Sequence, residues 1–399
     1  MIYLDNQATT PIDPRVLEKI VPYLTENFAN CHSQHQLGRQ MNSAVDVARQ
    51  QVASLIGAKP SEIIFTSGAT ESNNIAVKGA ARYAQKKHVI TSTIEHKCVL
   101  ESVRALEAEG YQTHFINVDD KGLIKMDEFK EACDRFKNDI GVVSIMAANN
   151  EMGSIQDIQE LGKISKRAGA VFHTDCAQAA GKIALNTENI DLMSISGHKI
   201  YGPKGVGALY VKRRTRLNPL FSGGGQEQNI RPGTLPVFLV VGLGEAAEIS
   251  QKQLVSDHKH YESLYNYASD KINKLEHVKF NGPDDKTKRL LNCMNVSFLG
   301  VEGESLMMAI DDDVCVSTGS ACTSQSLEPS HVLHAMDIPA EAAHTSVRMG
   351  FSRWTTKKDV DEGLDKIISE VNRLRDISIV WDLMKQGKNL NDVGAFGSH

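Results

Sequence analysis

Residues 63–91 read IIFTSGATESNNIAVKGAARYAQKKHVIT, and this stretch decides the fold. It opens with a short apolar run at 63–65 that is typical of a buried β-strand. From Asn73 to Gln85 the apolar side chains recur at helical spacing, and a second strand-type run follows at 88–91. Strand, helix and strand in this order predict an α/β protein with a largely parallel sheet.

The same alternation continues along the chain. Further strands are expected at 113–118, 140–146, 171–174, 192–196 and 206–211, and helices at 96–109, 126–136 and 157–167. One long helical stretch covers 236 to about 276, and shorter mixed elements follow at 295–298, 304–310 and 314–317. We therefore expect a large α/β domain over 15–255, a smaller α+β domain from 1–14 and 256–380, and a tail over 381–399.

Composition narrows the class of protein. The 399 residues are 41% hydrophobic and 23% charged, as in an ordinary globular protein, and the net charge of −5 argues against a nucleic-acid surface. The longest apolar stretch, 235–243, is too short for the ~20 residues that cross a bilayer. Seven cysteines without a CxxC pair, and no secretory signal, predict free thiols in a reducing compartment.

A candidate phosphate site lies between the first strand and its helix. Residues 66–72, TSGATES, combine hydroxyl side chains with the backbone N–H groups of a helix start, which bind phosphate well. They lack the lysine of a Walker loop. The alternative is an ordinary helix cap formed by Thr and Glu side chains.

Two further strand ends carry chemistry. Asp175 follows the strand 171–174, at the edge of the sheet where α/β proteins bind ligands, and it could pair with a protonated pyridine nitrogen. Gln178 could then reach a phenolate oxygen on the same ring. Lys199, in the turn SGHK, could form a Schiff base with a bound aldehyde. The alternatives are a helix cap at Asp175 and a surface charge at Lys199, but a phosphate site, a carboxylate and a lysine in this order indicate pyridoxal 5′-phosphate (PLP).

A histidine and a cysteine complete the candidates. His96 opens a helix, where the helix dipole favours the neutral imidazole, so it could accept a thiol proton; the alternative is a surface capping residue. Cys322 lies in the small, polar stretch STGSACTS at 317–324, which is typical of an exposed, reactive thiol. His331 and His334 lack further ligands nearby and do not predict a metal site.

Four motifs carry a resemblance to a known family: FTSGATESN at 65–73, SISGHKIYGPKG at 194–205, VEGES at 301–305, and the Cys322 stretch running into SLEPS at 326–330. The chain resembles cysteine desulfurases of the NifS/IscS-like group, in the class-V aminotransferase family. The resemblance extends from YLDNQATTP at 3–11 to Trp381. It implies the fold of type I PLP-dependent transferases.

The resemblance also assigns roles. It implies Lys199 as the Schiff-base lysine, Asp175 at the ring nitrogen, Gln178 at the ring hydroxyl and His96 over the ring. The implied phosphate ligands are Ala69, Thr70, Ser196 and His198, joined by Thr234 from the neighbouring subunit of a homodimer. Asn150 and Arg348 resemble the residues that hold the substrate carboxylate, for which the fork of an arginine is suited.

The implied reaction converts L-cysteine to L-alanine, with Lys199 moving the α-proton, His96 taking the thiol proton and Cys322 retaining the sulphur as a persulfide. The sulphur would pass to an IscU-like scaffold for iron–sulphur cluster assembly, with a frataxin-like protein as a further partner, and to other acceptors such as those of tRNA thiolation. No intrinsic metal is implied, although Cys322 could ligate a [2Fe–2S] cluster during transfer. The resemblance fits bacterial cytoplasm or a mitochondrion-like matrix, and we expect no partner membrane or nucleic acid.

Some positions depart from the family pattern: Cys31, Pro232, Thr318, Gln325 and the tail 390–399, which lacks the usual tryptophan. Competing interpretations are a selenocysteine lyase, another type I PLP enzyme such as an aminotransferase, and a non-catalytic sulphur carrier. An aminotransferase has no use for Cys322, and a carrier has no use for Lys199. A phosphate-binding hydrolase would need a metal or Walker signature.

Overall fold

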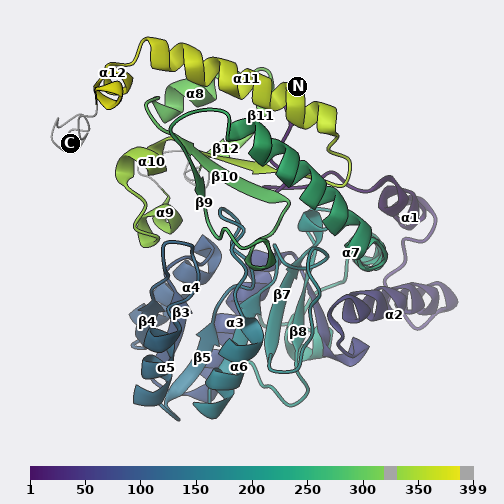
Figure 1. The fold of residues 1–399 in the computed structure, drawn as a ribbon. Coiled ribbons are helices and arrows are strands. Elements are labelled where there is room, and N and C mark those ends of the chain that lie inside the picture. Colours follow the sequence, from purple (N-terminus) through teal and green to yellow (C-terminus); the bar gives the residue numbers. More distant parts are fainter. Residues whose placement is uncertain (319–329, 387–399) are drawn as a thin grey trace.

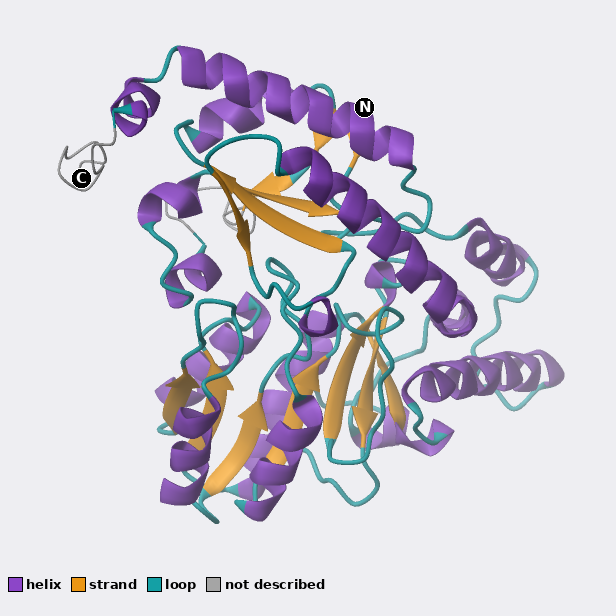
Figure 2. Cartoon of the chain, in the orientation of Figure 1, coloured by secondary structure: helices purple, strands orange, loops and turns teal. Residues whose placement is uncertain are grey.

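The computed structural model describes residues 1–318 and 330–386. Figure 1 shows a large sheet flanked by helices in the lower half of the molecule and a smaller sheet above it, with α7 (Val237–Ile272) beside both. Figure 2 shows the same two groups of strands in orange. Within the described residues, none of the helices combines the length and apolar character needed to cross a membrane.

The large sheet has seven strands in the order β2-β8-β7-β6-β5-β3-β4. Their bounds are β2 Ile63–Thr66, β3 His88–Ser92, β4 Gln112–Ile116, β5 Ile140–Ser144, β6 Val171–Asp175, β7 Leu192–Ser196 and β8 Gly207–Val211. Only β8 runs against its neighbours, so the predicted mainly parallel sheet is confirmed. Most of these strands are buried throughout, as expected when helices cover both faces.

The helices divide between the two faces of this sheet according to the alternation of side chains along the strands. Ile64 and Val142 pack with α3 (Ala69–Ala84) and α4 (Lys97–Ala108). Ile63 and Val143 point the other way and pack with α5 (Met126–Arg135), α6 (Ile158–Arg167) and the first half of α7. Because β2, β6 and β7 run in the same direction, the turns that follow them lie at one edge of the sheet.

The smaller sheet is antiparallel, in the order β12-β13-β10-β9. Its strands are β9 Val278–Asn281, β10 Cys293–Phe298, β12 Ser317–Thr318 and β13 Ser346–Gly350. Its core includes the second half of α7, α8 (Gly303–Ile310) and α11 (Lys357–Asp376). Leu4 belongs to this core, next to β1 (Ile2–Tyr3), which pairs with β11 (Val314–Cys315). The remaining helices are α1 Pro14–Thr25, α2 Gln36–Ile56, α9 His331–Ala335, α10 Ala340–His344 and α12 Ile379–Lys385.

Besides shifts of a few residues at other boundaries, three predicted elements differ from the structure. Helix α3 begins at Ala69 rather than at Asn73, because its first turn is polar and gives no apolar periodicity. The single element predicted at 314–317 is two strands, β11 and β12, which pair in different sheets. The tail predicted from Trp381 onward begins with helix α12, whose Trp381 ring lies 4.2 Å from the guanidinium of Arg375.

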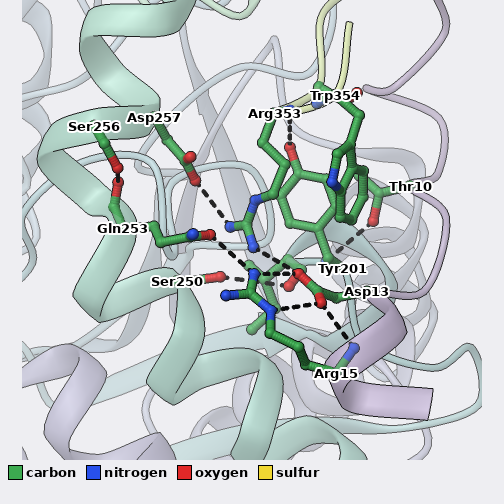
Figure 3. A network of polar contacts seen from close by, with 12 residues as sticks. Thr10, Asp13, Arg15, Tyr201, Ser250, Gln253, Ser256, Asp257, Arg353 and Trp354 are labelled. Carbon is green, nitrogen blue, oxygen red and sulfur yellow. Dashed lines mark hydrogen bonds and ion pairs between the residues drawn. The ribbon is translucent and has the colours of Figure 1, made fainter. Parts of the chain in front are cut away.

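A polar cluster, buried except for Arg15 at its rim, connects the two sheets, and we call Asp13, Arg15, Tyr201, Asp257 and Arg353 the junction cluster (Figure 3). Arg353 pairs with Asp13 at 3.1 Å and with Asp257 at 2.8 Å, and its guanidinium lies 4.0 Å from the centre of the Tyr201 ring. Tyr201 has a φ of 65°, a strained conformation for a residue with a side chain. The cluster therefore holds the turn after β7 against β13 and α7.

Candidate active site

A cavity of about 570 Å³ lies at the carboxyl edge of the large sheet. Its lining comes from the segments after β2, β3, β5, β6 and β7, from the N-terminal arm and from the strands β12 and β13. The predicted site residues among the lining are Ala69, Thr70, His96, Asn150, Asp175, Gln178, Ser196, His198, Lys199 and Arg348. Residues distant in the sequence thus meet at the edge where open α/β sheets bind ligands.

One end of the cavity is suited to a phosphate. The N-cap of α3 is Gly68, which has no side chain with which to cap the helix, and Ala69 and Thr70 line the cavity. A Cβ at Gly207 would lie 2.7 Å from the Cα of Gly68, so the close approach of these two turns requires glycine. Helix-start N–H groups without a side-chain cap favour an anion.

Two predicted phosphate ligands, Ser196 and His198, lie at the end of β7. Burial, with Lys199 and other nearby cations, lowers the pKa of His198 to about 4, so the imidazole is neutral at pH 7. Its Nδ1 lies 3.1 Å from the hydroxyl of Thr9. A neutral imidazole offers an anion one N–H group but no charge.

Asp175 is buried at the end of β6 and is oriented by two donors. Its Oδ2 accepts a hydrogen bond from the Asn73 amide at 2.7 Å, and its Oδ1 accepts one from the Ala177 N–H at 2.8 Å. The second contact is the capping role considered as an alternative, but it closes a turn and not an α-helix. Asn73 was not predicted as a site residue, although it ends the motif at 65–73; its position on the inner face of α3 could have identified it.

Lys199 and Gln178 meet at the N-terminal arm. The Lys199 amine donates to the main-chain oxygens of Gln7 and Ala8, the latter at 2.8 Å. The Gln178 amide donates to the same Gln7 oxygen at 3.0 Å. Sequence reasoning placed the arm with the small domain and missed its part in the cavity, because no local pattern links residues 5–8 to the turns after β6 and β7.

His96 is the N-cap of α4, which is the capping role considered as the alternative, but it is half-buried and lines the cavity rather than lying on the surface. Its Nδ1 accepts a hydrogen bond from the Cys98 N–H at 3.2 Å and lies 3.0 Å from the Cys98 sulphur. Burial lowers the pKa of His96 and raises the pKa of the Cys98 thiol to about 12. The neutral ring therefore carries its hydrogen on Nε2, and accepting a proton there requires the tautomer whose Nδ1–H faces the Cys98 sulphur.

Arg348, on β13, enters the cavity from the smaller sheet. Its Nη2 pairs with Asp5 at 2.7 Å and its Nη1 donates to the main-chain oxygen of Asn150 at 3.1 Å. Its Nε is buried and has no hydrogen-bond partner among the described residues. Arg289 and Arg353 also have a buried Nε without a partner in the described part of the chain, but of the three only Arg348 lines this cavity, where its guanidinium could meet a ligand acceptor such as a carboxylate.

Of the remaining residues singled out in the sequence, Thr234 and His331 are described and do not line the cavity. Thr234 is exposed and does not line it, which fits a role toward another subunit but does not test it. Cys322 and Gln325 lie outside the described residues; Ser317, shortly before Cys322, lines the cavity. His331 contacts the main-chain oxygen of Glu95 through Nε2, at 3.0 Å, and the described part of the chain contains no cluster of three metal-ligating side chains.

The donor set fits PLP. It joins a helix start suited to phosphate, a buried carboxylate, a lysine amine and an amide at one cavity, and these are the groups that PLP needs at its phosphate, ring nitrogen, aldehyde and ring hydroxyl. The buried Nε of Arg348 adds a donor for a substrate carboxylate.

Comparison with known proteins defines the class first. The family model for class-V aminotransferases matches residues 2–362, so the chain belongs to this family of PLP-dependent enzymes. Within the family it groups with the cysteine desulfurases. It is 52% identical to the mitochondrial cysteine desulfurase of Drosophila melanogaster, over 98% of this chain and 85% of the relative. It is 49% identical to cysteine desulfurase IscS of Rickettsia bellii, over 98% and 96%.

Solved structures agree with this placement. A NifS-like protein superimposes with a TM-score of 0.86 at 35% identity, over 94% of this chain and all of the other. A NifS-like protein from Rickettsia africae gives a TM-score of 0.83 at 31% identity, over 94% and 99%. The predicted type I PLP fold is therefore confirmed.

Proposed function

We propose that this chain acts as a cysteine desulfurase through the cavity described above, converting L-cysteine to L-alanine and retaining the sulphur on Cys322 as a persulfide. The observation that carries the proposal is the meeting of Lys199, Asp175 and the start of α3 at one cavity that also contains Arg348. The relatives are named cysteine desulfurases, which favours L-cysteine over selenocysteine as the substrate.

The residues around the cofactor have distinct tasks. When bound, PLP supplies an electron sink that stabilises negative charge at the substrate α-carbon. The Asp175 carboxylate keeps the ring nitrogen protonated, and the Asn73 amide holds that carboxylate in place at 2.7 Å. Lys199 would hold the cofactor and move the α-proton, and the arm at Gln7 and Ala8 holds its amine in the cavity before the cofactor binds.

The substrate is held and deprotonated from the other side of the cavity. Arg348 receives the carboxylate through its unpartnered Nε, with Asp5 and the Asn150 oxygen fixing the guanidinium plane. His96, neutral through burial, takes the thiol proton on Nε2 in the tautomer whose Nδ1–H faces the Cys98 sulphur. The Cys322 sulphur then bonds to the substrate sulphur while the substrate Cβ–S bond breaks, and its electron pair stays on the carbon, which gains a proton to form the alanine methyl group.

The finer assignments of partner and place belong to the same proposal. Thr234, exposed and away from its own cavity, would reach the phosphate site of a second subunit in a homodimer. The persulfide sulphur would pass to an IscU-like iron–sulphur scaffold, with a frataxin-like protein as a further partner. The relatives include bacterial IscS proteins and a mitochondrial enzyme, which supports either bacterial cytoplasm or a mitochondrial matrix.

The test is alanine and sulfide production from L-cysteine with a reductant. The wild type should turn over, and Cys322→Ser should retain PLP but lose turnover. Cys133→Ala, which alters a buried cysteine of α5 outside the cavity, is the matched control and should remain active. If Cys322→Ser releases sulfide at the wild-type rate, Cys322 is not the acceptor and a lyase that eliminates sulphur directly is the better account.

A further inference from the structure

The reaction outlined above gives no task to Lys182, yet this lysine is buried next to the site. Its side chain lies in the turn after β6, between the active cavity and a second cavity of about 80 Å³. Its amine donates a hydrogen bond to the Oε1 of Gln178 at 3.1 Å. Burying an amine costs free energy, and Lys182 has a neutral amide rather than a carboxylate as its partner, which suggests a functional role.

The surroundings of Lys182 disfavour its charge. Burial, followed by the charge of Lys199, lowers the pKa of Lys182 to about 7. The titratable or charged groups that act on it or share the second cavity are Lys199, Cys293, His258, Tyr261, Lys286 and Arg289. The amine donates hydrogen bonds in its charged and its neutral form, so its contact with Gln178 persists on either side of this pKa.

The two partners of Gln178 determine which end of its amide faces which way. The Lys182 amine donates and so selects the Oε1 of Gln178, whereas the main-chain oxygen of Gln7 accepts and so selects the Nε2, at 3.0 Å. Without these two partners the oxygen and nitrogen of a glutamine could exchange places. The NH₂ group is thereby kept on the side of Gln7 and Lys199.

We propose that Lys182 is a positioning residue, which fixes the Gln178 amide so that its second N–H remains directed at the oxygen of the cofactor ring. This inference rests on the proposed function, in which Gln178 faces the ring hydroxyl of PLP. An N–H donor stabilises the ionised form of that oxygen. It therefore lowers the pH at which the Schiff base between Lys199 and PLP loses its proton.

The test is the pH dependence of the visible absorbance of bound PLP, measured on the PLP-loaded protein without substrate. Lys182→Met preserves the length of the side chain and removes the donor. The absorbance midpoint should move to higher pH by about 0.5–1 unit, the effect of one lost hydrogen bond. Lys182→Gln, which still offers an N–H donor, should shift the midpoint less, and it carries the test if the methionine variant does not fold.

The same substitution in a Gln178→Ala protein distinguishes two explanations of the shift. Lys182 could act by positioning Gln178 or by its own charge, because removing a cation near the Schiff base would also raise the midpoint. In a Gln178→Ala protein, Lys182→Met should leave the midpoint unchanged. An equal shift in both backgrounds would mean that Lys182 acts by its charge alone and would overturn the inference, as would no shift in the wild-type background. If the wild type binds no PLP, the proposed function itself fails, and the two failures are therefore distinguishable.

Discussion

The junction cluster and the active cavity are both buried and polar, but they are built differently. In the junction cluster two arginines meet two aspartates, and Arg353 contacts Asp13 and Asp257 at once. In the cavity Asp175 takes its hydrogen bonds from an amide and a main-chain N–H, and Arg348 retains a buried Nε without a partner among the described residues. Arg353 also has a buried Nε without a partner among the described residues, so the two regions differ in how their carboxylates are paired. The aspartates of the junction cluster meet arginines, whereas Asp175 meets only neutral donors, which leaves its charge for a ligand.

The two regions are nevertheless connected through the chain. Tyr201 follows Lys199 closely in the turn after β7, and Arg353 follows Arg348 closely after β13. The main-chain N–H of Arg353 donates to the Tyr201 hydroxyl at 3.0 Å. The junction cluster thus fixes the backbone that carries two site residues, without contributing to the lining of the cavity. The predictions below test this division between fold and chemistry.

The largest effect is expected at Lys199. Lys199→Ala removes the covalent attachment of PLP and the group that moves the α-proton, so alanine production should fall by at least ~10³-fold. The unfolding midpoint should change little. Lys163→Ala, an exposed lysine of α6, serves as the control. Near-normal turnover by the Lys199 variant would contradict the assignment of this cavity as the active site.

Arg353→Ala should show the opposite pattern. It leaves the buried Asp257 without its cation, while Asp13 keeps its pair with Arg15, and the loss should cost about 3–5 kcal/mol of stability. Urea unfolding followed by fluorescence measures the loss, and the molecules that remain folded should retain the PLP absorbance. Arg373→Ala, which breaks an exposed pair with Glu370, should cost under about 1 kcal/mol. Equal losses in the two variants would show that the junction cluster has no special role.

The expected effect of Asp175→Asn is intermediate. The substitution preserves the shape of the side chain and an acceptor for the Asn73 amide, but it removes the negative charge that would face the ring nitrogen of the cofactor. The kcat for L-cysteine should fall by about 10²-fold, with stability unchanged or improved. Steady-state kinetics measures the loss of kcat, and the PLP spectrum reports whether the cofactor is still bound. Asp191→Asn, at an ion pair with Lys212 away from the cavity, is the matched control. A fully active Asp175 variant would contradict the pairing of this carboxylate with the cofactor.

The smallest effect concerns Glu95, a buried carboxyl beside His96. Burial raises the pKa of Glu95 to about 8, and one of its oxygens has no partner among the described residues. Because the folded protein retains a proton that the unfolded chain loses near pH 4.5, this group stabilises the fold at low pH. That contribution fades as the pH rises through 8. In the junction cluster the pKa shift has the opposite direction, because the hydrogen bond from Arg15 lowers the pKa of Asp13.

Glu95→Gln should therefore flatten the loss of stability with rising pH. Between pH 5.5 and 8.5 the wild type should lose about 2–3 kcal/mol more than the variant, read from unfolding midpoints at several pH values. Glu101→Gln, an exposed residue of α4, should follow the wild type. A variant that loses stability as steeply as the wild type would show that Glu95 is already ionised in the fold.

Much of the fold could be predicted from local patterns, and the reasons for the exceptions are physical. The strand–helix alternation predicted the parallel sheet, and the position of Asp175 after β6 and of Lys199 after β7 predicted one shared edge. The start of α3 was missed because its first turn is polar. Asn73 and Lys182 were missed as site residues because their importance comes from side-chain partners, Asp175 and Gln178, that only the folded chain brings within reach.

The most direct test of the central claim is mass spectrometry of the protein after a single exposure to L-cysteine without reductant. Our account predicts one added sulphur atom on the peptide that contains Cys322, lost again on reduction, and no such addition in Lys199→Ala. Added sulphur on another cysteine such as Cys98, or alanine formed with no sulphur on the protein, would contradict it.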